Sequence, residues 1–469
     1  MKIKFDKNFS FGTAMSGPQT EGNTNMQETN WDKYYLEDPN SFWDNIGPKI
    51  TTDTLRRFQE DVAIAKEIGL ESIRTSIQWA RIIKNFEVAE INQEGLDFYS
   101  TYFQAFKDAG IQVFVGLSHF DMPLVLHENY EGFYSRKVVD LFVDYAKVCF
   151  DNLSHLVDKW ITFNEPYSYV SGMYLRSAML PCEYSLEKHF IVTHHVLMAH
   201  KKVCDIFQKY NYKSEIGIVL DCMVPYARDP KNAGDVKASL YADLIKNRSF
   251  MDPVVKGEIS QEYFDLVKVC NYELPIIEGD LELIKSGKVD FIGVNYYRPE
   301  RVKAVPFMKN PEIPWGPEHL YQEFIMPKSR QNKHRGWEIY PKALYDLAMR
   351  VKNDYNNIPW YVSENGMGVE NEENYLDDKG QIQDDYRIEF ISEHLYWLHK
   401  AIEEGSNCFA YHLWTFIDNW SWRNAYKNRY GYVSLDLKTR NRRIKKSGYW
   451  MKKVIETREV DLGFLSDIE

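Results

Sequence analysis

Segments with the pattern of β-strands and segments with the pattern of α-helices alternate eight times along this chain of 469 residues. Apolar residues at 55, 58, 62, 65 and 68 fall on one face of the helix predicted at 54–68, and Gly69 follows as a C-cap. Strands that alternate with helices form parallel sheets, and eight such units predict a closed (β/α)8 TIM barrel rather than two doubly wound domains. The predicted strands cover 9–14, 72–77, 113–117, 159–164, 216–220, 290–295, 359–364 and 408–414, and the predicted helices cover 54–68, 93–109, 136–152, 186–210, 233–248, 341–355, 385–404 and 447–457.

This pattern assigns the chain to the α/β class, with a single barrel domain over 1–469, because no Pro/Ser-rich linker and no repeat divides it. Three connections, at 15–53, 297–340 and 365–384, are longer than ordinary loops between a strand and a helix. Long loops in this architecture carry function at the C-terminal face of the strands. We expect these three to form the rim of the barrel mouth.

Two of the predicted strands end in a glutamate. One run ends in Asn164-Glu165-Pro166 and the other in Glu364-Asn365-Gly366. Hydrolysis of a glycosidic bond needs one carboxylic acid to protonate the leaving oxygen and one carboxylate to attack the anomeric carbon. Either glutamate alone would fit a structural or surface carboxylate better, so the pair has to be weighed with its surroundings.

Polar and aromatic side chains stand at the other predicted strand ends. Buried amides and imidazoles need hydrogen-bond partners, so a group of them at one barrel mouth is hard to explain as core. A sugar would offer hydroxyl groups to the polar side chains and an apolar face to an aromatic ring. The residues are Gln19 after the first strand, Arg74 in the second, His119 after the third, Asn295 and Tyr297 at the sixth, and Trp414 at the eighth.

The charge balance excludes broad classes of partner. The chain has 57 Lys and Arg against 68 Asp and Glu, a net charge of −11, and no basic tract, which argues against nucleic acid or an anionic membrane as a partner. We expect no signal peptide and no membrane span, because no apolar run is long enough. The six cysteines show no CxxC spacing, which indicates neither a zinc site nor a disulfide framework and favours the cytoplasm.

These motifs resemble those of family 1 glycoside hydrolases, the retaining β-glycosidases, from Phe9 to about Met451. The NEP motif of the family matches residues 164–166 and implies that Glu165 is the acid/base, and the ENG motif matches residues 364–366 and implies that Glu364 is the nucleophile. The resemblance requires no metal or organic cofactor. The QxEG, HxDxP and NYY elements also match, and they imply sugar contacts from Gln19, His119 and Asn164, with Arg74 and Tyr297 beside the nucleophile.

The two carboxyl groups of a retaining enzyme are expected to stand about 5–5.5 Å apart and to act through a covalent glycosyl-enzyme. Arg74 beside Glu364 would keep that carboxylate ionised, whereas Glu165, near another negative charge and away from Arg74, would stay protonated near neutral pH. Formation of the ester removes the charge of Glu364. The pKa of Glu165 would then fall, and Glu165 could act as the base on water.

The loop after the eighth strand carries the information about the substrate. Family members that act on unphosphorylated sugars have a Glu at the position of Ser421, whereas phospho-β-glycosidases resemble this chain in having a Ser there and a Tyr that matches Tyr430. A carboxylate would repel a phosphate, and Ser421 could donate a hydrogen bond to one. The phospho-enzymes usually carry a Lys where this chain has Asn428, with Lys427 one residue earlier. We predict phosphate contacts from Ser421, Lys427 and Tyr430, with Arg423 as a further candidate for the positive charge.

The predicted substrate is therefore a small-molecule 6-phospho-β-glucoside, and alternatives stay open. In an ordinary β-glucosidase or β-galactosidase, Ser421 would act as a neutral group, and Lys427, Arg423 and Arg429 would be solvated loop charges. The third hypothesis, a non-catalytic sugar-binding barrel, is disfavoured because both glutamates are present.

Trp422 bears on the choice between glucose and galactose. Phospho-β-galactosidases tend to resemble this chain in having a Trp at that position, so a 6-phospho-β-galactosidase is a further alternative. We assign Trp422 to the sugar site with Asn295, Tyr297 and Trp414. Candidates for contacts with the aglycone are Trp315, Tyr321 and Trp337. The sequence leaves open which glycosidic linkage is hydrolysed. It also leaves open the oligomeric state, for which a homodimer is one option.

Overall fold

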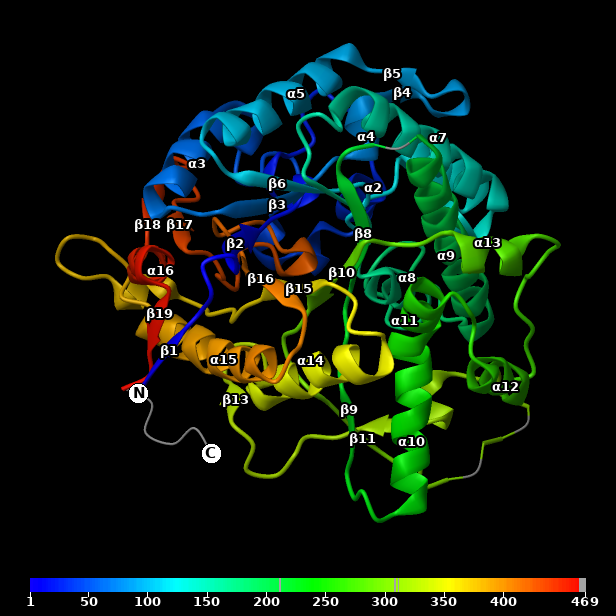
Figure 1. Ribbon diagram of the computed structural model, residues 1–469. Helices are drawn as coiled ribbons and strands as arrows, with labels where there is room; N and C mark the ends of the chain where they lie inside the picture. The colour runs from blue at the N-terminus through cyan, green and yellow to red at the C-terminus, as the bar shows by residue number, and fades with distance from the viewer. Residues whose placement is uncertain (211, 308, 311, 464–469) are drawn as a thin grey trace.

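Eight parallel strands close into a barrel in the computed structural model, which describes residues 1–210, 212–307, 309–310 and 312–463 (Figure 1). The order of the strands around the barrel follows the chain, and the last strand pairs with the first to close the ring. The predicted (β/α)8 barrel is thus confirmed, while residues 464–469 of the predicted domain lie outside the described residues. The barrel strands are β2 (Ser10–Ala14), β3 (Ser72–Ser76), β6 (Gln112–Gly116), β7 (Lys159–Asn164), β8 (Glu215–Leu220), β10 (Phe291–Asn295), β15 (Trp360–Asn365) and β16 (Cys408–Trp414).

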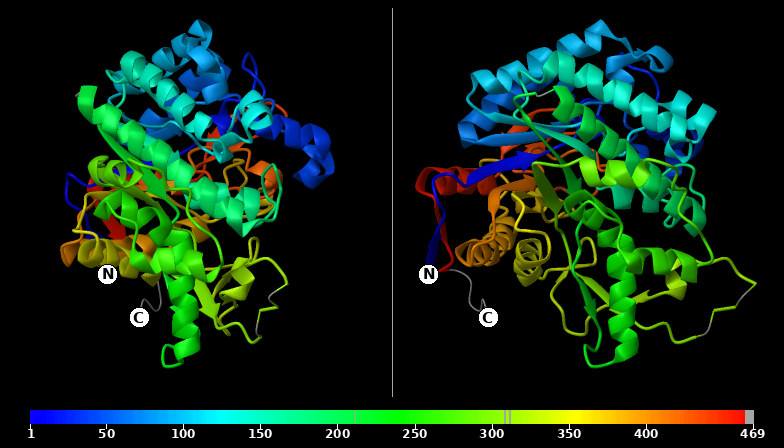
Figure 2. Two further views of the ribbon diagram at one scale, coloured as in Figure 1. Left: turned by 90° about the vertical axis from the view of Figure 1, so that its right-hand side faces the viewer. Right: turned by 45° about the vertical axis from the view of Figure 1, so that its right-hand side comes forward.

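Helices surround the barrel on its outside (Figures 1 and 2). The main ones are α3 (Thr54–Ile68), α5 (Gln93–Asp108), α7 (Arg136–Leu153), α9 (Leu186–Tyr210), α10 (Ala233–Asp243), α14 (Lys342–Asp354), α15 (Asp385–Glu403) and α16 (Lys446–Thr457). The helix predicted at 233–248 is found, but only its first part is α-helical, because the backbone continues as a π-helical turn at Leu244–Arg248 and then as a short helix α11 (Ser249–Met251). A π-helical turn inserts an extra residue that apolar periodicity alone does not reveal.

The interior of the barrel is filled with side chains at one level. One inward-facing residue from each of six strands contributes to a buried cluster that is separate from the core between barrel and helices. The ammonium of Lys159 lies 5.8, 5.0 and 4.8 Å from the ring centroids of Phe114, Phe291 and Phe409. A barrel packed in this way is closed at that level, so a ligand must enter from the other end. The cluster consists of Phe114, Ile161, Val219, Phe291, Tyr361 and Ala410.

The three long connections carry their own short elements. They include α1 (Gly17–Thr20) and α2 (Asn30–Glu37) in the first, the hairpin of β13 (Gln331–Asn332) and β14 (Trp337–Glu338) in the second, and a turn at Glu372–Tyr375 in the third. At the two ends of the chain, β1 (Lys2–Lys4) pairs with β19 (Glu459–Asp461). No helix within the described ranges is both long and apolar enough to cross a membrane.

Candidate active site

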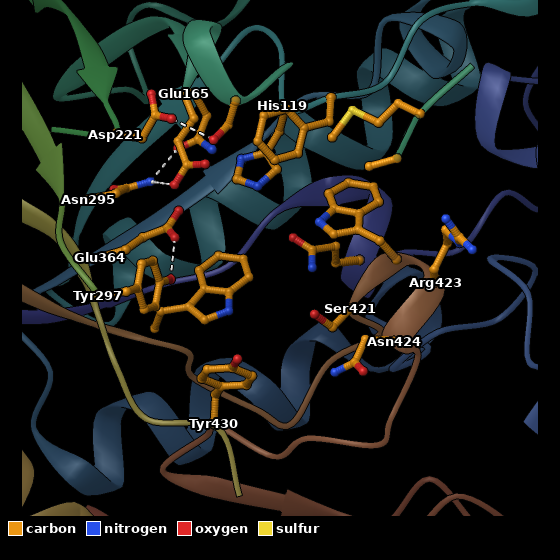
Figure 3. A pocket seen from close by; sticks show the side chains of 18 of the residues that line it. His119, Glu165, Asp221, Asn295, Tyr297, Glu364, Ser421, Arg423, Asn424 and Tyr430 are labelled. Carbon is orange, nitrogen blue, oxygen red and sulfur yellow. Dashed lines mark hydrogen bonds between the residues drawn. The ribbon is translucent and has the colours of Figure 1, made fainter. Parts of the chain in front are cut away.

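A cavity of about 460 Å³ lies at the carboxyl ends of the barrel strands and brings most of the predicted site residues together (Figure 3). The first and second long connections contribute Gln19, Trp31, Arg335 and Trp337 to its walls. Of the residues predicted for catalysis, for the sugar or for the phosphate, all but Lys427 line this cavity, except that Arg74 lies just behind the wall, bonded to Glu364. The lining members of that set are Gln19, His119, Asn164, Glu165, Asn295, Tyr297, Glu364, Trp414, Ser421, Trp422 and Tyr430.

Glu364 points into the barrel because β15 is irregular at its end. Val362 pairs with Val294 of β10, but Glu364, two positions on, already pairs with the next residue, Asn295. This bulge adds one residue to β15 and changes the direction in which the following side chains point. Simple alternation along the strand would give Ser363 and Glu364 opposite directions, yet both contact Arg74.

Both oxygens of the Glu364 carboxylate have partners. The guanidinium of Arg74 donates to Oε1. The hydroxyl of Tyr297 donates to Oε2 at 2.5 Å (Figure 3). Arg74 is itself fixed by bonds to Asn164 Oδ1 at 3.0 Å and Ser363 Oγ at 2.7 Å. An arginine that cannot release its proton, buried against this carboxylate, holds it in place and orients it for nucleophilic attack.

Glu165 stands at the turn between β7 and helix α8 (Pro166–Tyr174), with a left-handed backbone conformation at φ +48°. Asn295 Nδ2 donates to Glu165 Oε1 at 2.8 Å, which orients the carboxyl group (Figure 3). Burial raises the pKa of Glu165 well above its usual value, and the neighbouring charges of Asp221 and Glu364 raise the pKa further. A raised pKa keeps Glu165 protonated, as a general acid requires.

Aromatic rings form one wall of the cavity. The rings of Trp414 and His119 are nearly parallel at 5.9 Å, and Trp422 lies 6.1 Å from His119 and stacks on Trp31 at 4.5 Å. Burial, with a contribution from Arg74, lowers the pKa of His119 well below its usual value, so the imidazole is neutral. A neutral imidazole can exchange hydrogen bonds with a hydroxyl group without adding a charge to the site.

The loop after β16 brings Ser421 and Tyr430 to the cavity, but it does not bring Lys427. The ammonium of Lys427 lies outside the cavity, 3.6 Å from Glu370 Oε1, on a side chain that is 46% exposed. Asn428 is buried behind the cavity wall, and its Oδ1 accepts a hydrogen bond of 2.6 Å from Asn424. Arg423 lines the cavity near its exposed edge.

The three aglycone candidates fall in different places. Trp337 lines the cavity, whereas Trp315 packs against His319 with ring centroids 6.0 Å apart, and Tyr321 is buried with Lys246 over its ring at 5.5 Å. Trp337 therefore remains the candidate for contact with an aglycone.

The chain is similar in sequence to known proteins along almost its whole length. The model of the family described as Glycosyl hydrolase family 1 matches residues 1–460. The chain belongs to glycosyl hydrolase family 1. The protein is accordingly a glycoside hydrolase, and both the predicted family and the predicted enzyme class are confirmed.

Relatives of this family 1 enzyme match along almost their whole length. The 6-phospho-beta-glucosidase GmuD of Bacillus subtilis is 43% identical over 97% of this chain and 98% of its own. A 6-phospho-beta-galactosidase of Leptotrichia buccalis is 34% identical over 98% of this chain and 100% of its own. Among solved structures, a family 1 β-glucosidase from Thermotoga maritima is similar with a TM-score of 0.88 at 27% identity, over 98% of this chain and 99% of that one.

The sequence reasoning missed several residues of the cavity wall, among them Asp221, Trp31 and Arg335. Asp221 directly follows β8, so the search for strand-end carboxylates that found Glu165 and Glu364 could have found it too. Ser168 donates to Asp221 Oδ2 at 2.5 Å, and burial raises the pKa of Asp221 to about 6. Trp31, which stacks on Trp422, gave no such signal because it lies within a long connection.

Asp221 leads to a prediction about the pH dependence of this family 1 enzyme. Glu165 must be protonated to act as an acid, so kcat/KM falls as the pH rises through the pKa of Glu165. The Asp221 carboxylate raises that pKa, so Asp221→Asn should move the alkaline limb of the kcat/KM profile to lower pH. Asp221→Glu keeps the charge and should leave the limb closer to its original position. An alkaline limb that does not move in Asp221→Asn would contradict this electrostatic role.

Proposed function

We propose that this enzyme hydrolyses 6-phospho-β-glucosides with retention of the anomeric configuration. The observation that carries the proposal is Ser421, a neutral donor in the cavity at the position where family members acting on unphosphorylated sugars have a carboxylate. A phosphate dianion would be repelled by a carboxylate there and can accept a hydrogen bond from the serine hydroxyl. The printed name of the Bacillus subtilis relative supports the same substrate class.

The reaction would begin with Glu364 as nucleophile. One carboxylate oxygen attacks the anomeric carbon while the bond from that carbon to the leaving oxygen breaks, and Glu165 gives its proton to the leaving oxygen. Arg74 and Tyr297, which hold the two carboxylate oxygens, aim the attack. The product of this step is a glycosyl ester on Glu364 and a free aglycone.

The second step would reverse these roles with water. The ionised Glu165 takes a proton from a water molecule, whose oxygen attacks the anomeric carbon, and the ester bond breaks to restore the Glu364 carboxylate. Glu165 becomes the base because the ester has no negative charge, which removes the raising effect of Glu364 on the pKa of Glu165. Asn295 holds Glu165 in place through both steps.

The other contacts of the sugar follow from the walls of the cavity. Asn164 Oδ1 accepts from Arg74 and from Asn295, which leaves its Nδ2 to donate to a sugar hydroxyl. Gln19 and His119 offer further hydrogen bonds, and Trp414 and Trp422 offer apolar faces. Ser421 and Tyr430 would contact the phosphate. Lys427 is left out of this assignment because its ammonium is directed to Glu370.

A 6-phospho-β-galactosidase is the second candidate. Trp422 lines the cavity at the position where the resemblance places a Trp in phospho-β-galactosidases, and the Leptotrichia buccalis relative bears that name. A cytoplasmic location belongs to the same proposal, because a reducing compartment suits six scattered cysteines. A homodimer is compatible with the proposal but is not required by it.

The test compares nitrophenyl β-glucoside with its 6-phosphate. We expect a higher kcat/KM for the phosphorylated compound, and the corresponding galactosides measured in parallel distinguish the two phospho-sugar candidates. Faster turnover of the unphosphorylated glucoside would overturn the proposal in favour of an ordinary β-glucosidase.

Ser421→Glu provides a second, more local test. The new carboxylate should raise KM for the phosphorylated glucoside at least about 10-fold, because like charges placed together cost several kcal/mol. Turnover of the unphosphorylated glucoside should be spared. Ser421→Gln adds the same bulk without the charge and should have a smaller effect. Equal losses on both substrates would mean that Ser421 does not face the phosphate.

A further inference from the structure

The phosphate proposed above needs a positive charge, and the loop after β16 does not provide the expected one. Asn428 occupies the position where the resemblance places a lysine in phospho-β-glycosidases, and it is neutral and 2% exposed. Lys427 is turned outward to Glu370. A dianion in a partly closed cavity without a cation would lose more hydration than hydrogen bonds from neutral donors return.

A different segment brings a cation to this wall. Arg335 lies in the turn between β13 and β14 and lines the cavity. Asn332, at the start of the turn, donates from Nδ2 to the Gly368 carbonyl at 3.0 Å, which ties the hairpin to the loop after β15. The guanidinium of Arg335 lies 4.4 Å from the ring centroid of Trp337, an arrangement that restricts its orientation. The turn therefore holds Arg335 at the cavity wall.

Asn428 links Arg335 to the loop that carries Ser421. Arg335 Nη1 donates to Asn428 Oδ1 at 3.5 Å, and Asn424 Nδ2 donates to the same oxygen at 2.6 Å. The backbone N–H of Asn424 in turn donates to the Ser421 carbonyl at 3.0 Å. Asn424 and Ser421 lie next to each other at the cavity, on the same side as Tyr430 (Figure 3). The asparagine at the lysine position thus positions a cation from another part of the chain.

Arg335 also has an unused donor. Its Nε is buried and has no hydrogen-bond partner within the described ranges of the chain. Buried donors in folded proteins are nearly always paired, so the contacts within the chain do not use the full hydrogen-bonding capacity of this guanidinium. The oxygens of a phosphate fit the planar fork of a guanidinium, which can donate from two nitrogens at once.

The other arginines of the cavity are used differently. Arg298 lies between Glu300 and Glu323, at 4.0 and 3.7 Å from their carboxylates. Arg176 donates to the Ser168 carbonyl at 2.8 Å, beside Asp221 and away from the loop of Ser421.

Arg423 is the remaining cavity arginine. It is exposed, its Nε reaches the Ser41 carbonyl at 3.4 Å, and its guanidinium lies 5.7 Å from the Tyr34 ring centroid. Of the four, Arg335 is the one bonded into the Ser421 loop.

We propose that Arg335 determines specificity for the phosphorylated sugar, by binding the 6-phosphate together with Ser421, while Asn428 positions its guanidinium. This inference rests on the proposed function. It assigns to Arg335 and Asn428 together the role that a single lysine would have at position 428. Recognition by a guanidinium also fixes the direction of the phosphate, since the two N–H groups define a plane.

The experiment measures kcat/KM of Arg335→Gln on nitrophenyl β-glucoside with and without the 6-phosphate. Loss of a charge-assisted hydrogen bond should lower kcat/KM for the phosphorylated substrate about 10- to 100-fold, mainly through KM. The unphosphorylated substrate should be turned over as by the wild type, which also shows that the variant is folded. Inhibition by glucose 6-phosphate should weaken by a similar factor, and Arg335→Lys should recover part of the loss.

Lys427→Gln is the matched control, because it removes one positive charge from the same rim but outside the cavity. We expect it to keep the preference for the phosphorylated substrate. The inference is overturned if Arg335→Gln keeps that preference, whether or not Lys427→Gln loses it. A wild-type enzyme without any preference would instead refute the proposed function, so the two failures can be told apart.

Discussion

Glutamine in place of Glu364 is expected to lower kcat by at least about 10⁴-fold, as is typical when a nucleophile is removed. The amide is nearly the same size as the carboxylate but cannot form the glycosyl ester, so the first step of the reaction is lost. Steady-state rates on the phosphorylated nitrophenyl β-glucoside measure the loss. A Glu364→Gln enzyme with intact activity would refute the mechanism outright.

Two controls separate this chemical loss from a folding defect. Glu364→Gln leaves Arg74 without a carboxylate partner, so thermal unfolding should be recorded beside the rates. In Glu364→Ala, added formate can enter the space left by the side chain and attack the anomeric carbon in its place. We expect formate to raise the rate of this variant and to have no such effect on the wild type. Loss of activity without rescue, in a protein with lowered thermal stability, would point to a structural role instead.

Glutamine in place of Glu165 is expected to give a loss that depends on the leaving group. Without an acid, a poor leaving group such as an alkoxide has to depart unprotonated, and the rate of the first step should fall about 10²- to 10⁴-fold. A dinitrophenolate leaves without protonation, so its first step should be nearly unaffected. Rates on phosphorylated β-glucosides with alkyl, nitrophenyl and dinitrophenyl groups measure this dependence.

The same variant should also reveal the second step. Glu165→Gln has no base to activate water, so the glycosyl ester on Glu364 should accumulate with the dinitrophenyl substrate and appear as a burst of dinitrophenol. Equal losses across all three leaving groups, without a burst, would contradict the assignment of Glu165 as acid/base. Asp221→Asn serves as the comparison, since it changes the surroundings of Glu165 but keeps the acid itself.

Much of the fold was predictable because the pattern of strands and helices is regular. Strand β7 was predicted at the residues where it is found, and β15 is displaced by one residue, because buried parallel strands are short apolar runs with clear ends. The pattern did not reveal where the backbone departs from regular geometry, as in the π-helical turn that follows α10. It also could not show the bulge in β15 that turns Glu364 inward, since alternation along a regular strand has no place for an extra residue.

The positions of the two glutamates followed from their places at strand ends, and so did those of Gln19, His119, Asn295, Tyr297 and Trp414. The direction in which a loop side chain points could not be predicted from the sequence. Lys427 and Arg335 are both cations on the rim, and their sequence neighbours do not show that the first faces Glu370 while the second reaches Asn428. That choice depends on which loops pack together, and contacts across 93 residues are not encoded in any local pattern.

The sequence by itself determined the barrel, the family and the two carboxylates, because strand periodicity and short motifs are local properties of the chain. Only the tertiary structure decided how those carboxylates are held and which cation reaches the Ser421 loop. The bonds from Arg74 and Tyr297 to Glu364, and the effect of Asp221 on Glu165, join residues from different strands. The physical reason is that pKa values and ligand contacts depend on distances in space, which closure of the barrel and packing of its long loops establish.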